Sequence, residues 1–90
     1  MAQAIVDPEE LRRFAQSLRA FGTELENSLT VLNGQMAALG DTWRDQEQQK
    51  FAQEFEQVLQ ALQRFLEATG QHVPFLLRKA ERVEEYLRQR

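Results

Sequence analysis

Carboxylates are the most numerous chemically active side chains of this 90-residue chain, which has 14 Asp and Glu residues. Two carboxylates facing one cavity can perform general acid–base catalysis. Glu54 and Glu56 are two residues apart, so a helix would place them on different faces. The acids near the C-terminus share a helical surface with basic residues at spacings typical of ordinary ion pairs: Glu81, Glu84, Glu85, Arg78, Arg82 and Arg88. We therefore predict no catalytic site and no enzyme activity.

The single histidine, His72, is a poor basis for a metal site, because metal ions in proteins need several converging ligands. The chain has no Cys, which excludes disulfides and thiolate ligands. His72 lies two residues before Pro74, so we expect an exposed polar side chain beside a bend; a pH-sensitive group is the alternative. No glycine-rich phosphate loop is present either, and we expect neither a metal nor a cofactor.

The length and charge of the chain predict one small domain, residues 1–90, with no nucleic-acid partner. The formal net charge is −3, and a nucleic-acid protein is usually basic. Residues 77–90 are an exception within the chain, with 5 Lys and Arg against 3 Asp and Glu, a balance of +2. A neighbouring chain running in the opposite direction can place an acidic stretch against this basic end.

A long helix is predicted from about residue 8 to residue 39. Asp7 is a favourable N-cap, Pro8 suits the first helical position, and an acid follows three residues after the cap. Apolar residues then recur every three or four positions, which indicates a single stripe along a helix: Leu11, Phe14, Leu18, Phe21, Leu25, Leu29, Leu32, Met36 and Leu39. Gly40 follows the last of them and is a natural helix stop.

A second helix is predicted from about residue 44 to residue 90, after a turn at about residues 40–43. Asp41 and Thr42 are its candidate N-caps. Its apolar stripe has the same spacings: Phe51, Phe55, Val58 or Leu59, Leu62, Phe65 or Leu66, Thr69, Val73, Leu76 or Leu77, Ala80, Val83 and Leu87. Pro74 removes one backbone hydrogen bond, so we expect a kink near residues 70–74; a helix end there is the alternative.

These elements predict an all-α fold, an antiparallel two-helix hairpin. The short connection makes the helices antiparallel neighbours. Counting back from the turn places Leu76 opposite Pro8, so residues 77–90 are expected to overhang the hairpin. Because a hairpin has no interior of its own, we expect a dimeric four-helix bundle. The expected core and dimer interface contains Leu11, Phe14, Leu18, Phe21, Leu25, Leu29, Leu32, Met36, Phe51, Phe55, Leu59, Leu62, Phe65 and Leu66.

Trp43, the only tryptophan, lies in the predicted turn and not on a stripe. One interpretation is a hydrophobic cover over the open end of the hairpin. The other is a recognition residue, because Trp is frequent among the residues that dominate binding energy at interfaces. Both interpretations stay open on the sequence alone.

The segment from Leu39 to Phe51 resembles the central turn of WXG100 proteins, the ESAT-6-like family of small helical hairpins. In that family a Trp-x-Gly turn is followed by a Phe about eight residues after the Trp, as Trp43 and Phe51 are here. Chain length and the two flanking stripes match as well, so the resemblance covers nearly the whole chain. The turn residues Trp43, Arg44 and Asp45 depart at the third position, which is typical of a divergent Trp-Arg-Asp branch.

The resemblance implies a dimeric four-helix bundle that is secreted folded through a type VII (ESX-like) machine without a cleaved signal peptide. It implies as partners a second copy of the chain (a homodimer) or a related hairpin, and a secretion ATPase. The family's export signal combines the Trp turn with a C-terminal Tyr-x-x-x-Asp/Glu of the partner. Tyr86 matches the Tyr of this signal, whereas Arg90 stands in place of the acid.

Two functions follow from these features. The first is a WXG100-like protein that acts through helix–helix contacts as a type VII secretion substrate or carrier. The alternative is an intracellular helical adaptor that docks a larger helical protein and is not exported. The residues alone show neither a secretory signal peptide nor an apolar stretch of membrane-spanning length, so we expect synthesis in the cytoplasm and no transmembrane segment.

Overall fold

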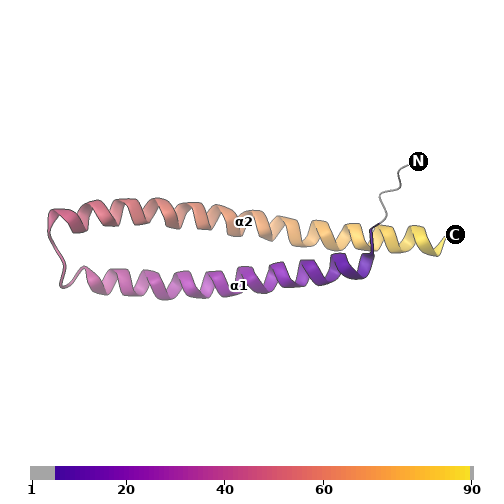
Figure 1. The fold of residues 1–90 in the computed structure, drawn as a ribbon, viewed down its shortest axis with the longest axis horizontal. Helices are drawn as coiled ribbons and strands as arrows, with labels where there is room; N and C mark the ends of the chain where they lie inside the picture. Colours follow the sequence, from indigo (N-terminus) through magenta and orange to yellow (C-terminus); the bar gives the residue numbers. More distant parts are fainter. Residues whose placement is uncertain (1–5, 90) are drawn as a thin grey trace.

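Residues 6–89 of the chain, described by a computed structural model, form a long antiparallel hairpin of two helices, α1 (Pro8–Leu39) and α2 (Gln46–Arg88). The helices lie side by side along their length, with the turn at one end and the start of α1 and the end of α2 at the other (Figure 1). The molecule measures 68 × 24 × 14 Å, so it is barely thicker than a single helix in its thinnest direction. The all-α hairpin predicted from the two stripes is confirmed.

Helix α1 begins at the expected cap. The side chain of Asp7 accepts a hydrogen bond from the backbone nitrogen of Glu9 at 2.9 Å, which satisfies one of the free N–H groups of the first turn. At the other end Gly40 adopts φ −62°, an ordinary right-handed conformation, so the stop does not use the left-handed freedom of glycine. The helix ends because the next residues form tight backbone turns, in which the nitrogens of Thr42 and Trp43 donate to Leu39 O.

Helix α2 begins at Gln46, and its N-cap is Asp45, not Asp41 or Thr42 as the sequence predicted. Asp45 Oδ1 accepts a hydrogen bond from the backbone nitrogen of Gln48 at 2.9 Å. The prediction was wrong because the Thr42 hydroxyl is used elsewhere, donating to Leu39 O at 3.3 Å and so closing α1. The connection is therefore Gly40 to Asp45, slightly longer than expected.

Helix α2 continues through Pro74, so the alternative of a helix end at residues 70–74 is wrong. A proline inside a helix removes only one backbone hydrogen bond and crowds one preceding turn. A Cβ atom placed at Gly70, four residues earlier, would meet no neighbouring atom outside its own helical backbone within 4 Å, so the ring of Pro74 does not crowd this position. The long packed surface on either side holds the helix together across this point.

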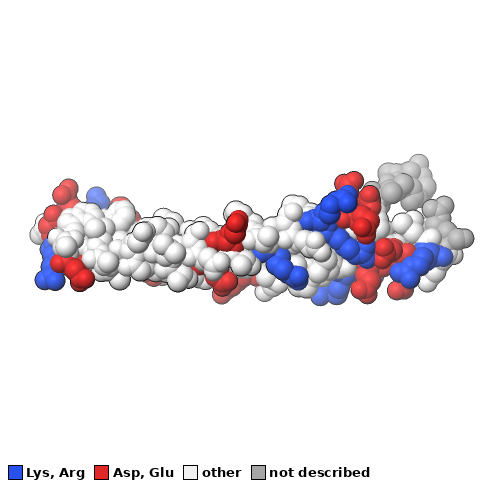
Figure 2. All heavy atoms as spheres, turned by 90° about the horizontal axis from the view of Figure 1, so that it is seen from below, with Lys and Arg blue, Asp and Glu red and all other residues white. Residues whose placement is uncertain are grey.

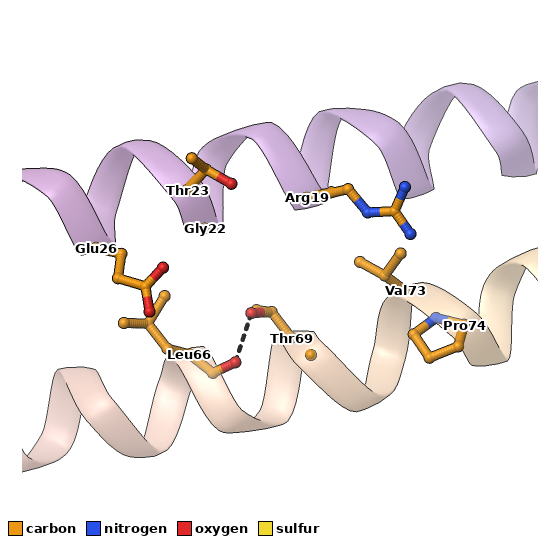
Figure 3. Close-up of a pocket in the computed structure, with 9 residues that line it drawn as sticks. Arg19, Gly22, Thr23, Glu26, Leu66, Thr69, Val73 and Pro74 are labelled. Atoms are coloured by element: carbon orange, nitrogen blue, oxygen red, sulfur yellow. Dashed lines mark hydrogen bonds between the residues drawn. The ribbon is translucent and has the colours of Figure 1, made fainter.

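The contact between the helices is built from small residues. Ala15 of α1 and Ala80 of α2 have no exposed surface, and Leu29, Thr69 and Val73 are buried with them. Figure 3 shows Thr69 and Val73 directed from α2 toward α1, where Gly22 presents only backbone. The Thr69 hydroxyl donates to Leu66 O at 2.9 Å, so this buried polar group is satisfied within its own helix. Small side chains let the two backbones approach closely.

Helix α2 overhangs the start of α1 (Figure 1), but the overhang begins later than residue 77. Ala80 is fully buried in the hairpin, and Arg12 near the start of α1 pairs with Glu84 through two hydrogen bonds of 2.6 and 3.1 Å. Counting back from the turn failed because helical side chains tilt toward the N-terminus of their own helix. The side chains of α1 point toward the open end of the hairpin, and those of α2 point toward the turn. Two side chains that touch therefore belong to residues whose backbones lie at different positions along the hairpin axis.

Candidate functional site

The turn presents Trp43 against the first turns of α2. Its ring lies 5.9 Å from that of Phe51, measured between centroids and tilted by 33°, and Phe51 in turn stacks on Phe55 at 5.7 Å. The side chain is half-buried, and its backbone nitrogen is held by Leu39 O at 2.9 Å. Trp43 therefore has a fixed position and stays partly accessible, an arrangement compatible with both interpretations given above.

Asp45 occupies the position where the family pattern has glycine, and the structure accounts for this departure. The residue has φ −95° and ψ −175°, an extended conformation that does not require glycine. It is the N-cap of α2, a position favoured by both Asp and Gly, with Asp adding a side-chain acceptor. Arg44 beside it donates from Nε to Gly40 O at 3.3 Å, which fastens the turn. The turn of this chain therefore does not require glycine at this position.

A continuous apolar surface lies beside the contact between the helices. Phe14 is 59% exposed and Phe21 50%, although both are large aromatic residues. Phe21 packs edge-to-face on Phe65 of α2 at 5.9 Å, so residues of both helices contribute to one surface. Most neighbours on each helix are seven residues apart, about two turns, as expected for one helical face. We call this surface the open face: Phe14, Phe21, Leu32, Leu39, Phe51, Val58 and Phe65.

Near the turn the open face deepens into a groove. Its lining includes Leu32, Met36 and Leu39 from α1 with Phe51 and Phe55 from α2, and its volume is about 580 Å³. Charged side chains gather toward the two ends of the hairpin on the side drawn in Figure 2, whereas much of the middle is uncharged.

The residues expected at the core and interface divide into two groups. Leu29 is buried between α1 and α2, and several others are half-buried beside it: Leu11, Leu18, Leu25, Met36, Phe55, Leu59, Leu62 and Leu66. Phe14, Phe21, Leu32, Phe51 and Phe65 remain exposed on the open face. The hairpin alone therefore buries only part of the predicted set. Tyr86, the expected C-terminal signal residue, is 63% exposed and lies outside the open face.

Sequence reasoning missed two features of the hairpin contact. Ala15 is fully buried, but a small residue beside a stripe of larger ones gives little signal. The pair of Arg12 and Glu84 joins positions 72 residues apart, which only the register of the two helices reveals. Hydrogen bonding from Arg12 lowers the pKa of Glu84 below its ordinary value. The same hydrogen bonding raises the pKa of Arg12 above the ordinary value of an arginine.

The ion pairs expected among the C-terminal charges are mostly absent. Over residues 6–89, Glu84 pairs with Arg88 at 3.8 Å and Arg12 at 2.6 Å, whereas Arg78 and Arg82 form no salt bridge. Nor do three or more His or acidic residues gather at one point in this part of the chain as a metal site requires. No stretch of either described helix is apolar and long enough to cross a bilayer.

Comparison with known proteins places these features in a family. The model of the family described as "Proteins of 100 residues with WXG" matches residues 3–86. A search of curated proteins finds no match. The crystal structure of the secreted protein EsxB from Bacillus anthracis str. Sterne is similar at 29% identity, with a TM-score of 0.77, covering 96% of this chain and 98% of that one.

Two single-substitution variants of the same Bacillus anthracis str. Sterne protein are similar as well. One is 29% identical with a TM-score of 0.76, covering 94% of this chain and 98% of its own. The other is 28% identical with a TM-score of 0.73, covering 96% of this chain and 94% of its own. The family model matches nearly the whole length of this chain, and the Trp turn lies at the centre of the match. This chain therefore belongs to the WXG100 family.

Proposed function

We propose that this chain is a non-enzymatic WXG100 protein that pairs with a second copy of itself and is exported through a type VII machine. The observation that carries the pairing is the open face, where large aromatic and aliphatic side chains of both helices stay in contact with water. Burying a side chain such as Phe or Leu stabilises an assembly by about 1.5–3 kcal/mol. Seven such residues give the hairpin a strong tendency to pair, and two open faces together make a four-helix bundle.

The charge distribution favours two copies that run in opposite directions. Residues 41–56 at the turn end hold 5 Asp and Glu against 2 Lys and Arg, a balance of −3, whereas residues 77–90 have a balance of +2. Opposite copies bring the acidic turn of one against the basic end of the other, whereas parallel copies place like charges together. A related hairpin from the same cell is the competing partner.

Export is the second half of the proposal, and Trp43 is the residue proposed to signal it. The similar EsxB is a secreted protein, and the family resemblance assigns the Trp turn and a C-terminal Tyr to the export signal. Trp43 is fixed on Phe51 with part of its ring accessible, and Tyr86 is exposed. Asp45 keeps the turn in shape, so the missing glycine does not argue against recognition. A secretion ATPase is the proposed receptor.

The experiment follows the untagged protein in its native host, with an antibody and a cytoplasmic marker that reports lysis. We expect the wild type in the medium without the marker, and Trp43→Ala retained inside the cell. Val31→Ala is the matched control, because Val31 is also exposed and apolar but lies outside both the turn and the open face. It should be exported normally.

Far-UV circular dichroism of both variants must show the wild-type helix content, because a misfolded chain would also be retained. Retention of the wild type would contradict export and leave the intracellular adaptor as the function. Export of Trp43→Ala at the wild-type level would show instead that the turn is not the signal.

A further inference from the structure

A basic and aromatic surface runs along the C-terminal part of α2. Phe75, Lys79, Arg82 and Tyr86 are spaced by four, three and four residues, which places them on one helical face, and Arg78 lies beside them. All five side chains are exposed; Phe75 is 52% and Tyr86 63% accessible. We call these five residues the basic strip.

The basic strip points away from α1. Each of its four regularly spaced members is two residues further along the chain than a residue that faces α1, namely Val73, Leu77, Ala80 and Glu84. Two residues correspond to roughly 200° around a helix, so the strip lies on the opposite side of α2. None of its residues is a member of the open face, although Lys79 and Tyr86 continue the seven-residue spacing of Val58 and Phe65 along α2.

The cations of the strip are not engaged inside the hairpin. Arg78, Lys79 and Arg82 form no salt bridge with any residue between 6 and 89, although Glu81 and Glu85 are close in sequence. Glu84, the half-buried acid of this segment, is turned toward Arg12 on the other helix. The register of the hairpin thus draws Glu84 away from the strip. The strip keeps three positive charges and two exposed aromatic rings, with Glu81 and Glu85 exposed beside Arg78 and Arg82.

We propose that the basic strip is a docking surface for an acidic amphipathic helix of a partner protein. Three cations within two turns complement a run of carboxylates, and the rings of Phe75 and Tyr86, about 16 Å apart along the helix, suit two apolar side chains of a helix lying alongside. Exposed aromatic residues next to cations are the usual anchors of such contacts.

The charge of the whole chain favours a protein helix over a lipid or nucleic-acid surface. The net charge is −3, so an extended anionic surface would repel most of the molecule while attracting only this strip. A membrane-bound helix also needs a broad apolar face, whereas the strip offers two aromatic residues. A short acidic helix meets the strip alone.

The test uses the full-length protein and a synthetic helical peptide that carries two Leu residues flanked by Glu, labelled for fluorescence anisotropy. We expect it to bind, and the same peptide with every Glu replaced by Lys to fail. Reversing Arg78, Lys79 and Arg82 to Glu should weaken binding by about tenfold or more. The matched control reverses Arg13, Arg19 and Lys50, which are exposed cations elsewhere, and should bind as the wild type does.

Both triple variants change the net charge by −6, from −3 to −9, so a difference between them reports position and not total charge. No binding of the acidic peptide, equal weakening by both variants, or tighter strip-dependent binding to phosphatidylglycerol vesicles would overturn the proposal. The assay reads peptide binding and neither pairing nor export, so its failure is distinguishable from failure of the proposed function, even though Tyr86 and the three cations belong to both.

Discussion

Substituting Gly22 by alanine tests the close approach of the two helices. A Cβ atom at Gly22 would lie 3.6 Å from Thr69 Oγ1 and 3.8 Å from Leu66 Cδ2, which are ordinary van der Waals distances. The space therefore accepts one methyl group without moving either neighbour. Gly22 lies in the middle of α1, where glycine weakens a helix.

The expected magnitude has two parts. Replacing glycine by alanine inside a helix gains about 1 kcal/mol from helix propensity. A methyl group that touches two side chains but stays half-accessible adds about 0.4 kcal/mol, half the value of a fully buried CH₂. Gly22→Ala should thus raise the free energy of unfolding by about 1–1.5 kcal/mol. Gly22→Leu should instead lower it by about 1–3 kcal/mol, because Thr69 occupies the space that the longer side chain needs.

The assay is urea unfolding followed by far-UV circular dichroism, at one protein concentration because an assembling protein has concentration-dependent stability. Gly34→Ala is the matched control, since no atom outside its own helical backbone lies within 4 Å of its Cβ position and only the propensity part, about 1 kcal/mol, is expected. A loss of stability in Gly22→Ala, with Gly34→Ala stabilised as expected, would refute the reasoning. The helices would then approach more closely than described.

Three further perturbations probe the buried contact, the turn and the ion pair. Leu29→Ala should lower the free energy of unfolding by about 2–4 kcal/mol, because Leu29 is 3% exposed; urea unfolding measures the loss, and a change below 1 kcal/mol would place Leu29 outside the core. Asp45→Ala should cost about 1 kcal/mol through the lost N-cap, whereas Thr42→Ala should cost less than half of that; equal losses in thermal unfolding would contradict the assignment of the cap. Glu84 has its pKa lowered by Arg12, so its contribution to stability is present above the ordinary glutamate pKa and is lost as pH falls through the lowered folded-state value. Arg12→Gln should restore the ordinary pKa of Glu84 in an NMR titration, and an unchanged value would show that the pair does not form in solution.

The sequence predicted the helices well where local signals were strong. Asp7 and Pro8 mark the start of α1, and the stripe from Leu11 to Leu39 ends where the helix does. The start of α2 was placed wrongly because Asp41, Thr42 and Asp45 are all good caps. Only the direction of the chain after Trp43 decides which of them is used.

The register of the hairpin could not be predicted by counting from the turn. The point at which contact between the two helices ends depends on the tilt of the side chains along each helix. This tilt brings Arg12 to Glu84 and buries Ala80. The stripes identified apolar residues without saying which of them face the neighbouring helix and which stay open. This division places Leu29 between the helices and Phe21 on the open face. Predicting it requires knowing how each helix is rotated about its own axis.

The candidate site was predicted only in part, because the sequence does not show which way each side chain faces. Trp43 was distinguished by its position off both stripes, and the structure shows the Phe51 ring on which it lies. The sequence identified residues 77–90 as basic but not the strip within them, because Arg78 and Arg82 alternate with Glu81 and Glu85 as in many solvated helices. The charge of the strip depends on the direction of the Glu84 side chain, which turns toward Arg12 on the other helix.

Sedimentation equilibrium of the purified protein at micromolar concentration is the most direct test of the central claim, that the open face is covered by a second copy. We predict a mass of twice the 10.5 kDa of the chain. A mass of 10.5 kDa, in a sample whose circular dichroism shows the full helix content, would contradict the claim, because the open face would then be stable in water.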